Sequence, residues 1–368
     1  MNIFSKEKVN TGRQIEFDIA KAICIIGMVF VHTYEYFLPH DVMLVGFQNA
    51  LVNVIQMLVG APCFMICMGI GIAYTSKNSS DDLLKRGLKI FILGFVLNAL
   101  REGFIYLFGS IVGLFPSEAY PFLVIDTFLN NDIMPFAGLS LMLMGLLKRF
   151  KFNDKQIMIT AIILSIIGSI FRNFDVNSIL NFTVGLFFGT YDNAHDIITS
   201  YFPLFNWFIF VAFGYCFGEL FKRCNNKKKF YLIVSSVCAV IVTIYLLIAV
   251  PNNIGMIDPN LLNYYHLTTP ETLISMMSSL VIFGIYYALS FVLPKAVTDF
   301  TSTASKNINK IYCIHWVIIG NFRAILFFIY KTVQFSQGQC VIFAISVFTI
   351  SYIIAYFYDK RLKQKRAQ

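Results

Sequence analysis

The chain has 368 residues, of which 57% are hydrophobic and only 13% are charged. Soluble domains carry about 25% charged residues, so this composition excludes an ordinary soluble protein and indicates an all-α polytopic membrane protein. The formal net charge of +9 does not indicate a nucleic-acid partner, because Lys and Arg gather in the short loops between apolar runs, where membrane topology favours them.

The first apolar run, residues 15–37, is long enough to cross a bilayer, which takes about 20 mostly apolar residues. It carries Asp18 and Lys21 near one end and His32 and Glu35 near the other. Ionisable groups inside a span are costly, so by default they face the protein interior or a wet cavity. A helix places Lys21 and His32 on one face, about 16 Å apart along its axis.

Further apolar runs follow, and each is expected to be a transmembrane helix. In chain order they cover residues 44–74, 90–108, 122–147, 156–171, 201–221, 230–250, 271–293, 311–330 and 341–358. The segment 172–200 holds an apolar core, residues 179–189, that is too short to span. We therefore expect about ten transmembrane helices plus a re-entrant or interfacial segment near 172–200, in a single integral-membrane domain over residues 1–368.

The distribution of Lys and Arg predicts the orientation of the chain. If the N-terminus is cytoplasmic, the basic loops after the second, fourth, sixth and eighth runs and the basic tail, residues 359–368, all lie inside. The loops that lack Lys and Arg, such as residues 251–270, then lie outside, as the positive-inside rule requires. We expect a multi-pass protein of the cell membrane with both termini cytoplasmic.

The eight cysteines form neither a metal-binding pattern nor a disulfide framework. Nearly all lie inside apolar runs, where Cys behaves as a small hydrophobe. The closest spacing, Cys63-x3-Cys67, has no second pair beside it. We expect no metal in this protein.

Four stretches of the chain carry a family resemblance. The first run has Asp18-x-x-Lys21 followed, after ten residues, by His32, and the others are LLKRGLKIF (83–91), YFPLFNWFIFVAFGYCFGELF (201–221) and KNINKIYCIHWVI (306–318). In this order they resemble the acyltransferase transmembrane superfamily, which includes the type-3 acyltransferases and the heparan-glucosaminide N-acetyltransferase relatives. That superfamily usually has Arg where this chain has Lys21. The resemblance implies transfer of an acyl group, expected to be acetyl, from cytosolic acyl-CoA to a hydroxyl or amine of an acceptor on the far side, commonly a sugar.

His32 is the central catalytic candidate. An imidazole can take the proton of the acceptor as a general base, or it can carry the acyl group itself, and the sequence leaves both roles open. A third interpretation is a buried imidazole that only bonds a neighbouring helix. Glu35, one turn further on, could orient His32 or could be a solvated residue at the helix end, and Asp18 completes the expected catalytic set.

Four basic residues are candidates for binding the phosphates of CoA, since cations and phosphates form charge-assisted hydrogen bonds. They are Lys21, Lys85, Arg86 and Lys89. Basic loops at cytoplasmic helix ends are, however, expected in any membrane protein. His315, one turn from Tyr312 in the ninth run, could orient the donor or could only bond across helices.

The acceptor would meet charged residues near the outer ends of the third and fourth runs, namely Arg101, Glu102, Asp126 and Asp132. Arg101 could instead snorkel to the membrane interface, and the two Asp side chains could cap helices. Trp207 could stack on a sugar, although a membrane-interface anchor is the simpler reading. Residues 264–266, in an outer loop, could cover the site, although anchoring at the surface is the simpler interpretation. Arg323 is a further candidate for the acceptor.

A transporter or flippase of a polar or lipid-linked solute is the alternative function, because its spans would also hold charged residues. Transporters often have broken helices at matching positions of two repeats, and the sequence shows no such pair. The expected partners are acyl-CoA, an extracytoplasmic carbohydrate-type acceptor and the lipid bilayer.

Overall fold

The computed structural model describes residues 2–39, 54–114, 120–177, 179–257, 261–331 and 333–367, and most of these are helical. The first predicted span folds as α1 (Ile15–Phe37), with the predicted bounds. The start of the second predicted span, residues 44–53, and part of the loop 251–270 lie outside the described residues.

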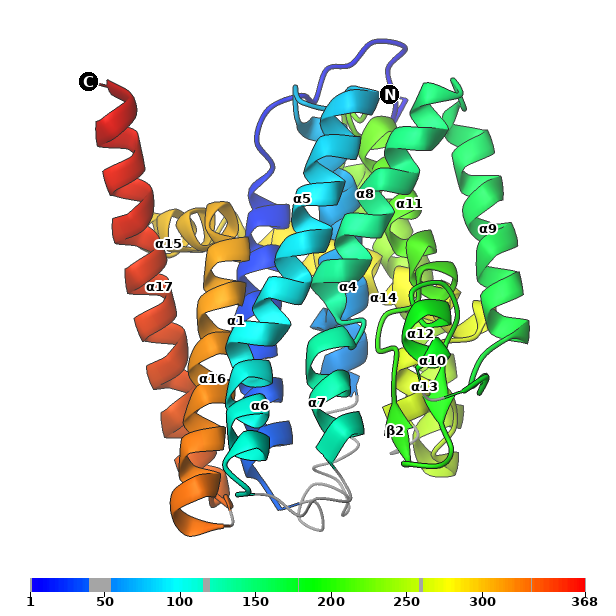
Figure 1. The fold of residues 1–368 in the computed structure, drawn as a ribbon. Helices are drawn as coiled ribbons and strands as arrows, with labels where there is room; N and C mark the ends of the chain where they lie inside the picture. The colour runs from blue at the N-terminus through cyan, green and yellow to red at the C-terminus, as the bar shows by residue number, and fades with distance from the viewer. Residues whose placement is uncertain are drawn as a thin grey trace. The chain divides into compact units, whose positions relative to one another are not determined.

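The other elements follow in chain order (Figure 1). They are α4 (Ala61–Tyr74), α5 (Ser80–Asn98), the π-helix η1 (Ala99–Gly103), α6 (Phe104–Ile111), α7 (Tyr120–Leu129), α8 (Ile133–Arg149), α9 (Asp154–Ile170), α10 (Leu180–Val184), β1 (Tyr191–Asp192), β2 (Ile197–Ile198), α11 (Leu204–Phe221), α12 (Lys227–Asn252), the 3-10 helix η2 (Gly255–Ile257), α13 (Leu261–Tyr265), α14 (Thr269–Leu289), α15 (Lys295–Lys306), α16 (Ile308–Tyr330) and α17 (Gln337–Ala367).

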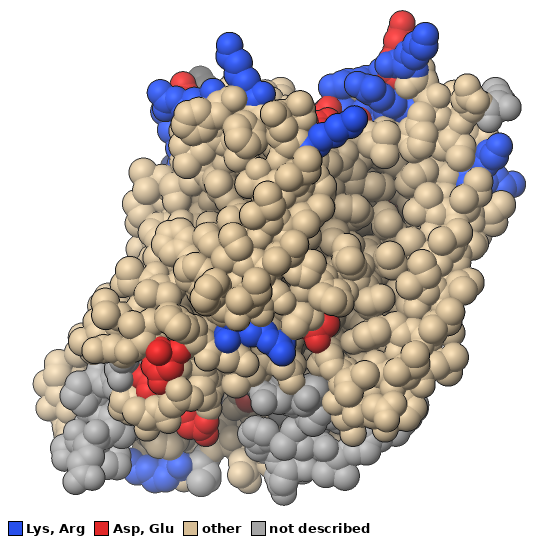
Figure 2. Space-filling model, turned by 90° about the vertical axis from the view of Figure 1, so that its right-hand side faces the viewer, with Lys and Arg blue, Asp and Glu red and all other residues tan. Residues whose placement is uncertain are grey.

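Within the described residues, seven helices are long and apolar enough to cross a membrane. They cover Val54–Tyr74, Ser80–Ile111, Leu204–Phe221, Lys227–Asn252, Thr269–Leu289, Ile308–Tyr330 and Gln337–Lys365. Each corresponds to one predicted span. On the face drawn in Figure 2, residues other than Lys, Arg, Asp and Glu form most of the surface, and apolar side chains of α12 such as Leu232 and Leu247 are 67% and 71% exposed. The expected all-α, multi-pass membrane protein is therefore confirmed.

The predicted fourth span, residues 122–147, is wrong as a single helix. It is broken at Asn130–Asp132, between the end of α7 and the start of α8. Asp132 is the N-cap of α8 and accepts a hydrogen bond from the backbone N–H of Ile133 at 2.6 Å. The side chain of Asn131 donates to the carbonyl oxygens of Gly185 and Phe202 at 3.0 and 2.9 Å. Asn and Asp favour such caps and turns over helix interiors because their side chains compete for backbone hydrogen bonds.

The third predicted span, residues 90–108, is longer than expected. Continuous helix runs from α5 through η1 to the end of α6, and Arg101 and Glu102 lie in the π-helical turn. A π-helical turn within an α-helix is rare and often marks a functional site.

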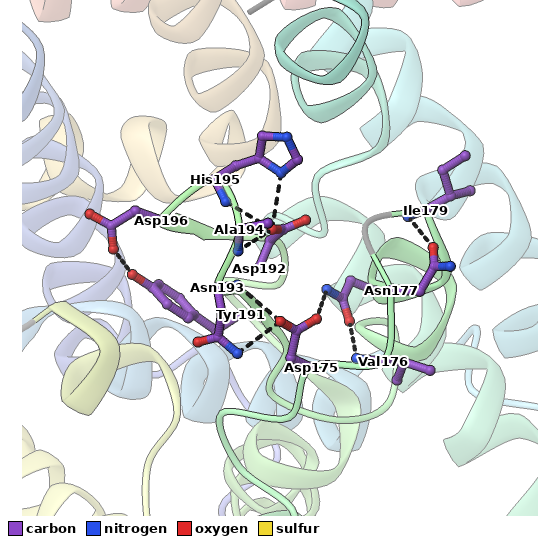
Figure 3. Close-up of polar contacts among 11 residues, drawn as sticks. Asp175, Val176, Asn177, Ile179, Tyr191, Asp192, Asn193, Ala194, His195 and Asp196 are labelled. Carbon is purple, nitrogen blue, oxygen red and sulfur yellow. Dashed lines mark hydrogen bonds and ion pairs between the residues drawn. The ribbon is translucent and has the colours of Figure 1, made fainter.

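The segment 172–200 folds around its own polar side chains (Figure 3). Asp175 accepts hydrogen bonds from the side chains of Asn181 and Asn193, both at 2.8 Å. Asp192 accepts from the backbone N–H groups of Ala194 and His195 at 2.9 and 3.0 Å, beside the antiparallel pair β1–β2. The helix in its described part, α10, has only five residues, so this part contains no spanning helix.

Tertiary contacts group the chain into two compact units, each made of several segments. The first unit comprises Met1–Arg13, Asn53–Val96 and Leu129–Tyr287, and the second comprises Gln14–Val52, Leu97–Phe128 and Ala288–Gln368. In the first unit α11 packs against α4, α8 and α9. Helices α4 and α11 approach closely, since a Cβ on Gly214 would overlap the carbonyl oxygen of Ile66.

In the second unit α1, α16 and α17 run alongside one another, and α15 crosses them (Figure 1). The π-helix η1 packs on α16. A Cβ on Gly320 of α16 would overlap the carbonyl oxygen of Arg101, so glycine at this position permits the close approach. The second unit therefore brings together three elements that carry ionisable residues inside the spans: α1, η1 and α16.

Candidate active site

His32 and Glu35 form a hydrogen-bonded pair on α1. The Nδ1 atom of His32 lies 3.2 Å from Oε2 of Glu35, and the two side chains are 16% and 17% exposed. They meet because residues three apart on a helix lie on the same face. A carboxylate only accepts hydrogen bonds, so Nδ1 carries a proton, and in the neutral form of the ring Nε2 holds the lone pair. This arrangement leaves one basic and nucleophilic nitrogen, Nε2 of His32, available for chemistry.

His315 and Trp316 of α16 flank this imidazole. The ring centres of His32 and His315 are 5.7 Å apart, with planes only 10° from parallel, and the ring centre of Trp316 lies 4.1 Å from that of His32. His315 is fully buried, and its Nδ1 donates a hydrogen bond to the carbonyl oxygen of Ile311 at 3.1 Å. Two helices at opposite ends of the chain thus form one aromatic and imidazole cluster.

Two polar atoms of this cluster are buried and have no hydrogen-bond partner among the described residues. They are Nε2 of His315 and Nε1 of Trp316. An unpaired buried polar group costs about 1–3 kcal/mol, and the great majority of such groups in folded proteins are paired. The cluster is therefore an incomplete polar site, which a bound molecule with polar groups could complete.

Charged residues surround the cluster. The guanidinium carbon of Arg101 in η1 lies 4.5 Å from the centre of the Trp316 ring, and that of Arg323 lies 4.7 Å from the centre of the Tyr36 ring. The Nη1 atom of Arg323 is 3.9 Å from Oε1 of Glu102. Arg101 and Glu102 are 6% and 7% exposed, so Arg101 does not extend to the membrane interface as the snorkelling alternative required.

The structure places the other expected catalytic residue, Asp18, away from His32. Asp18 accepts hydrogen bonds from the hydroxyl groups of Ser305 and Ser302 in α15, at 2.6 and 3.5 Å. It is fourteen positions before His32 on the same helix, which is about 21 Å along the axis. Asp18 therefore joins α1 to α15 and does not contact the His32 cluster.

The donor candidates lie on two helices. Lys21 is half-buried on α1 in the second unit. Lys85, Arg86 and Lys89 are all exposed on α5 in the first unit. The expected acceptor residue Asp126 is half-buried on α7 in the second unit.

Two expectations for aromatic and imidazole residues of the first unit are wrong. Trp207 is fully buried, and its indole N–H donates to the carbonyl oxygen of Tyr265 at 2.7 Å, so it is not an anchor at the membrane interface. His266 is also fully buried, with Nε2 2.8 Å from the carbonyl oxygen of Ser200 and Nδ1 2.6 Å from the side-chain amide of Asn173. Both residues hold the interior of the first unit together instead of facing the surface.

Sequence reasoning missed Trp316 and Tyr36 as parts of the cluster. One signal was present: Trp316 is one of only two tryptophans in the chain and directly follows His315. Within the described residues, no group of three or more His, Cys, Asp or Glu side chains could hold a metal ion.

A family model described as "Heparan-alpha-glucosaminide N-acetyltransferase, catalytic" matches residues 13–249, which is more than half of the chain. The matched part contains His32, Glu35, Arg101 and Glu102, whereas His315 and Trp316 lie beyond it. No curated protein and no solved structure matches the chain. The chain therefore belongs to the heparan-alpha-glucosaminide N-acetyltransferase catalytic family and is a multi-pass membrane acetyltransferase.

Proposed function

We propose that this protein transfers an acetyl group from cytosolic acetyl-CoA to a hydroxyl or amine of an extracytoplasmic acceptor of the carbohydrate type. The observation that carries the proposal is the His32–Glu35 pair on α1, with Nδ1 and Oε2 3.2 Å apart beside the ring of Trp316. Membership of an acetyltransferase family favours this function over the transporter alternative.

His32 is the reacting group in this proposal, through its Nε2 atom. Acyl transfer to a hydroxyl or amine needs a base or a nucleophile that tolerates a gain of positive charge. Glu35 supplies the compensating negative charge, and its hydrogen bond fixes the orientation of the ring. Such a carboxylate–imidazole pair is the arrangement by which many acyl-transfer enzymes activate an imidazole.

Basic residues are proposed to bind the CoA moiety. Lys85, Arg86 and Lys89 are exposed on α5 and could form charge-assisted hydrogen bonds with phosphate oxygens. Lys21 lies about 16 Å from His32 along α1, and an extended pantetheine arm has a similar length. A CoA phosphate near Lys21 would therefore let the thioester reach His32.

The acceptor is proposed to contact Arg101, Glu102 and Arg323, which lie beside the cluster, and Asp126 on α7. Sugars present many hydroxyl groups, and charged side chains form hydrogen bonds with them that are stronger than neutral ones. We assign structural roles to Asp132 and Trp207. Asp132 caps α8, and the indole N–H of Trp207 already donates a hydrogen bond to the carbonyl oxygen of Tyr265.

The proposed topology has ten spans and cytoplasmic termini: the seven long apolar helices plus α1, the α7–α8 pair and α9. An Asn252→Cys variant at the exposed end of α12 should react with an impermeant maleimide in intact cells. An Arg361→Cys variant in the basic end of α17 should react only after permeabilisation, with the native cysteines measured as background. The reverse pattern would invert the orientation.

The proposed function is tested with purified protein, labelled acetyl-CoA and glucosamine as the probe acceptor. Removing a catalytic base or nucleophile typically lowers the rate about 10²–10⁴-fold, and we expect His32→Ala to lose transfer to this extent. The matched control is His195→Ala, because His195 is 42% exposed on the β1–β2 connection. If His32→Ala transfers acetyl at the wild-type rate while binding acetyl-CoA, His32 is not the reacting group.

A further inference from the structure

The cluster contains two imidazoles with the same hydrogen-bond arrangement. In each ring Nδ1 is the donor, to Glu35 in His32 and to the carbonyl oxygen of Ile311 in His315. Each ring therefore keeps its lone pair on Nε2. The rings stack with centres 5.7 Å apart, so a molecule that reacts at one ring lies next to the other.

A transfer in one step, from thioester to acceptor, needs only one base. A transfer in two steps needs two groups, because an imidazole that carries the acetyl group has no lone pair left to take a proton. His32, which is partly exposed and paired with Glu35, fits the carrier role. His315 fits the role of the base, because it is fully buried and its Nε2 has no hydrogen-bond partner among the described residues.

We propose that His315 is a second catalytic base, which takes the proton of the acceptor while His32 holds the acetyl group. The inference rests on the proposed function and assigns a step to each histidine. It gives His315 a role in the acceptor half of the reaction, in place of the donor contact expected from the sequence.

In the first step Nε2 of His32 attacks the thioester carbonyl carbon of acetyl-CoA. A C–N bond forms, the C–S bond breaks, and CoA leaves as the thiolate while Glu35 faces the positive acetyl-imidazole. In the second step the acceptor oxygen or nitrogen attacks the same carbon, and its proton passes to Nε2 of His315. The C–N bond then breaks, His32 regains its lone pair, and His315 releases the proton to the thiolate or to water.

The other charged and titratable groups near the two rings lie on α1, η1 and α16. Glu35 bonds His32, and Oε1 of Glu102 in η1 lies 3.9 Å from Nη1 of Arg323 in α16, with no hydrogen-bond partner among the described residues. The guanidinium group of Arg101 lies over Trp316, and the ring of Tyr312 is 5.2 Å from that of His315 in an edge-on contact. Arginine cannot act as a base under these conditions. Of the two rings that pack on His32, those of His315 and Trp316, only the ring of His315 has a basic lone pair.

The test separates the two steps in wild type, His32→Ala, His315→Gln and His315→Phe. The first step is measured without acceptor, as exchange of labelled CoA into acetyl-CoA. The second is measured as acetyl transfer to glucosamine and, separately, to hydroxylamine, which is neutral at pH 7.5 and reacts without a base. Both His315 variants should exchange CoA at rates within a few-fold of wild type, and His32→Ala should not exchange.

We expect both His315 variants to lose transfer to glucosamine about 10²–10⁴-fold, the usual contribution of a general base, and to keep transfer to hydroxylamine. Equal losses of exchange and transfer, or no loss of either, would overturn the role of His315. A wild-type protein that transfers acetyl but shows no exchange would overturn the two-step scheme and leave the proposed function standing. A wild-type protein that does neither would contradict the proposed function itself.

Discussion

Arg101 and Trp316 form a buried cation–π pair, with the guanidinium carbon 4.5 Å from the centre of the indole ring. The two side chains are 6% and 4% exposed, and desolvated pairs of this kind contribute about 2 kcal/mol. The pair joins the π-helical turn to α16 at the point where Trp316 packs on His32. The pair therefore connects η1 to the indole ring that packs on the imidazole of His32.

The carboxylate of Glu35 should matter through its charge. Glu35→Gln keeps the size of the side chain and can still accept from Nδ1 of His32, but it removes the negative charge beside the imidazole. Hydrogen bonds to charged groups contribute about 1.5–3 kcal/mol, so we expect acetyl transfer to fall by about 10- to 150-fold. The measurement is the turnover number at saturating acetyl-CoA.

Glu7→Gln is the matched control for this substitution, because Glu7 is exposed in the N-terminal segment. It should leave turnover unchanged. If Glu35→Gln retains full turnover, the hydrogen bond at 3.2 Å does not serve the reaction and Glu35 is only a helix-end residue.

The close approach of η1 and α16 should be sensitive to one methyl group. In Gly320→Ala the new Cβ would overlap the carbonyl oxygen of Arg101, and the two elements would have to separate. Overpacking of this kind costs about 1–3 kcal/mol, so we expect a lower Tm together with weaker acetyl transfer, because Arg101 moves relative to Trp316.

Gly71→Ala is the control for Gly320→Ala, since a Cβ at Gly71 in α4 meets nothing within 4 Å. Alanine is the better helix former at such a position, by about 0.5–1 kcal/mol, so its Tm should be equal or higher. A Gly320→Ala protein as stable and active as Gly71→Ala would show that the approach of η1 to α16 is not needed.

His266 should make the stability of the protein depend on pH. Burial lowers the pKa of His266 to about 4, against the opposing effect of its hydrogen bond with the carbonyl oxygen of Ser200, and the charge of Arg172 also lowers the pKa. An unfolded His titrates near pH 6.5. Between these values the unfolded chain binds the proton and the folded chain does not, so stability is full above about pH 6.5 and falls as the pH is lowered towards 4.

The pKa of His266 is lowered by about 2.5 units on folding, and each unit is equivalent to about 1.4 kcal/mol, so the loss of stability is at most about 3.5 kcal/mol. The measurement is the Tm in detergent from pH 7.5 to 4.5, for wild type and His266→Gln. The wild-type Tm should fall more steeply below pH 6.5, because the variant has no group that must be protonated on unfolding. Parallel curves would mean that His266 is protonated equally in both states.

The long apolar runs could be predicted from the sequence because hydrophobic length alone distinguishes a span. The bounds of α1 were predicted correctly for this reason. The break between α7 and α8 was missed although three residues that favour caps, Asn130, Asn131 and Asp132, stand in a row there. The hydrogen-bond partners of Asn131, at Gly185 and Phe202, lie far along the chain. Local sequence does not reveal these contacts, so the apolar residues on both sides of the break predicted one continuous helix.

The site could be predicted only in part. The face of α1 with His32 and Glu35 followed from helical spacing, since both lie on one helix. The stacking of His32 on His315 and Trp316 depends on how α1 and α16 pack. The sequence of either helix alone does not predict this contact. The π-helical turn at Arg101 was equally hidden, because its sequence Ala-Leu-Arg-Glu-Gly does not differ in kind from an ordinary helix.

The exposed basic residues of α5 should recognise the phosphates of the donor. In Arg86→Glu a cation is replaced by an anion, and losing a charge-assisted hydrogen bond of about 1.5–3 kcal/mol should weaken acetyl-CoA binding by about 10- to 150-fold. S-acetylpantetheine carries the same thioester and arm but no phosphate, so its affinity should be unchanged by the substitution. The measurement is the Kd of each donor for wild type, Arg86→Glu and the control Arg361→Glu, which reverses another exposed charge, on α17. We expect only Arg86→Glu to reduce the preference for acetyl-CoA over S-acetylpantetheine. If the preference is the same in all three proteins, Arg86 serves membrane topology alone and the phosphates are bound elsewhere.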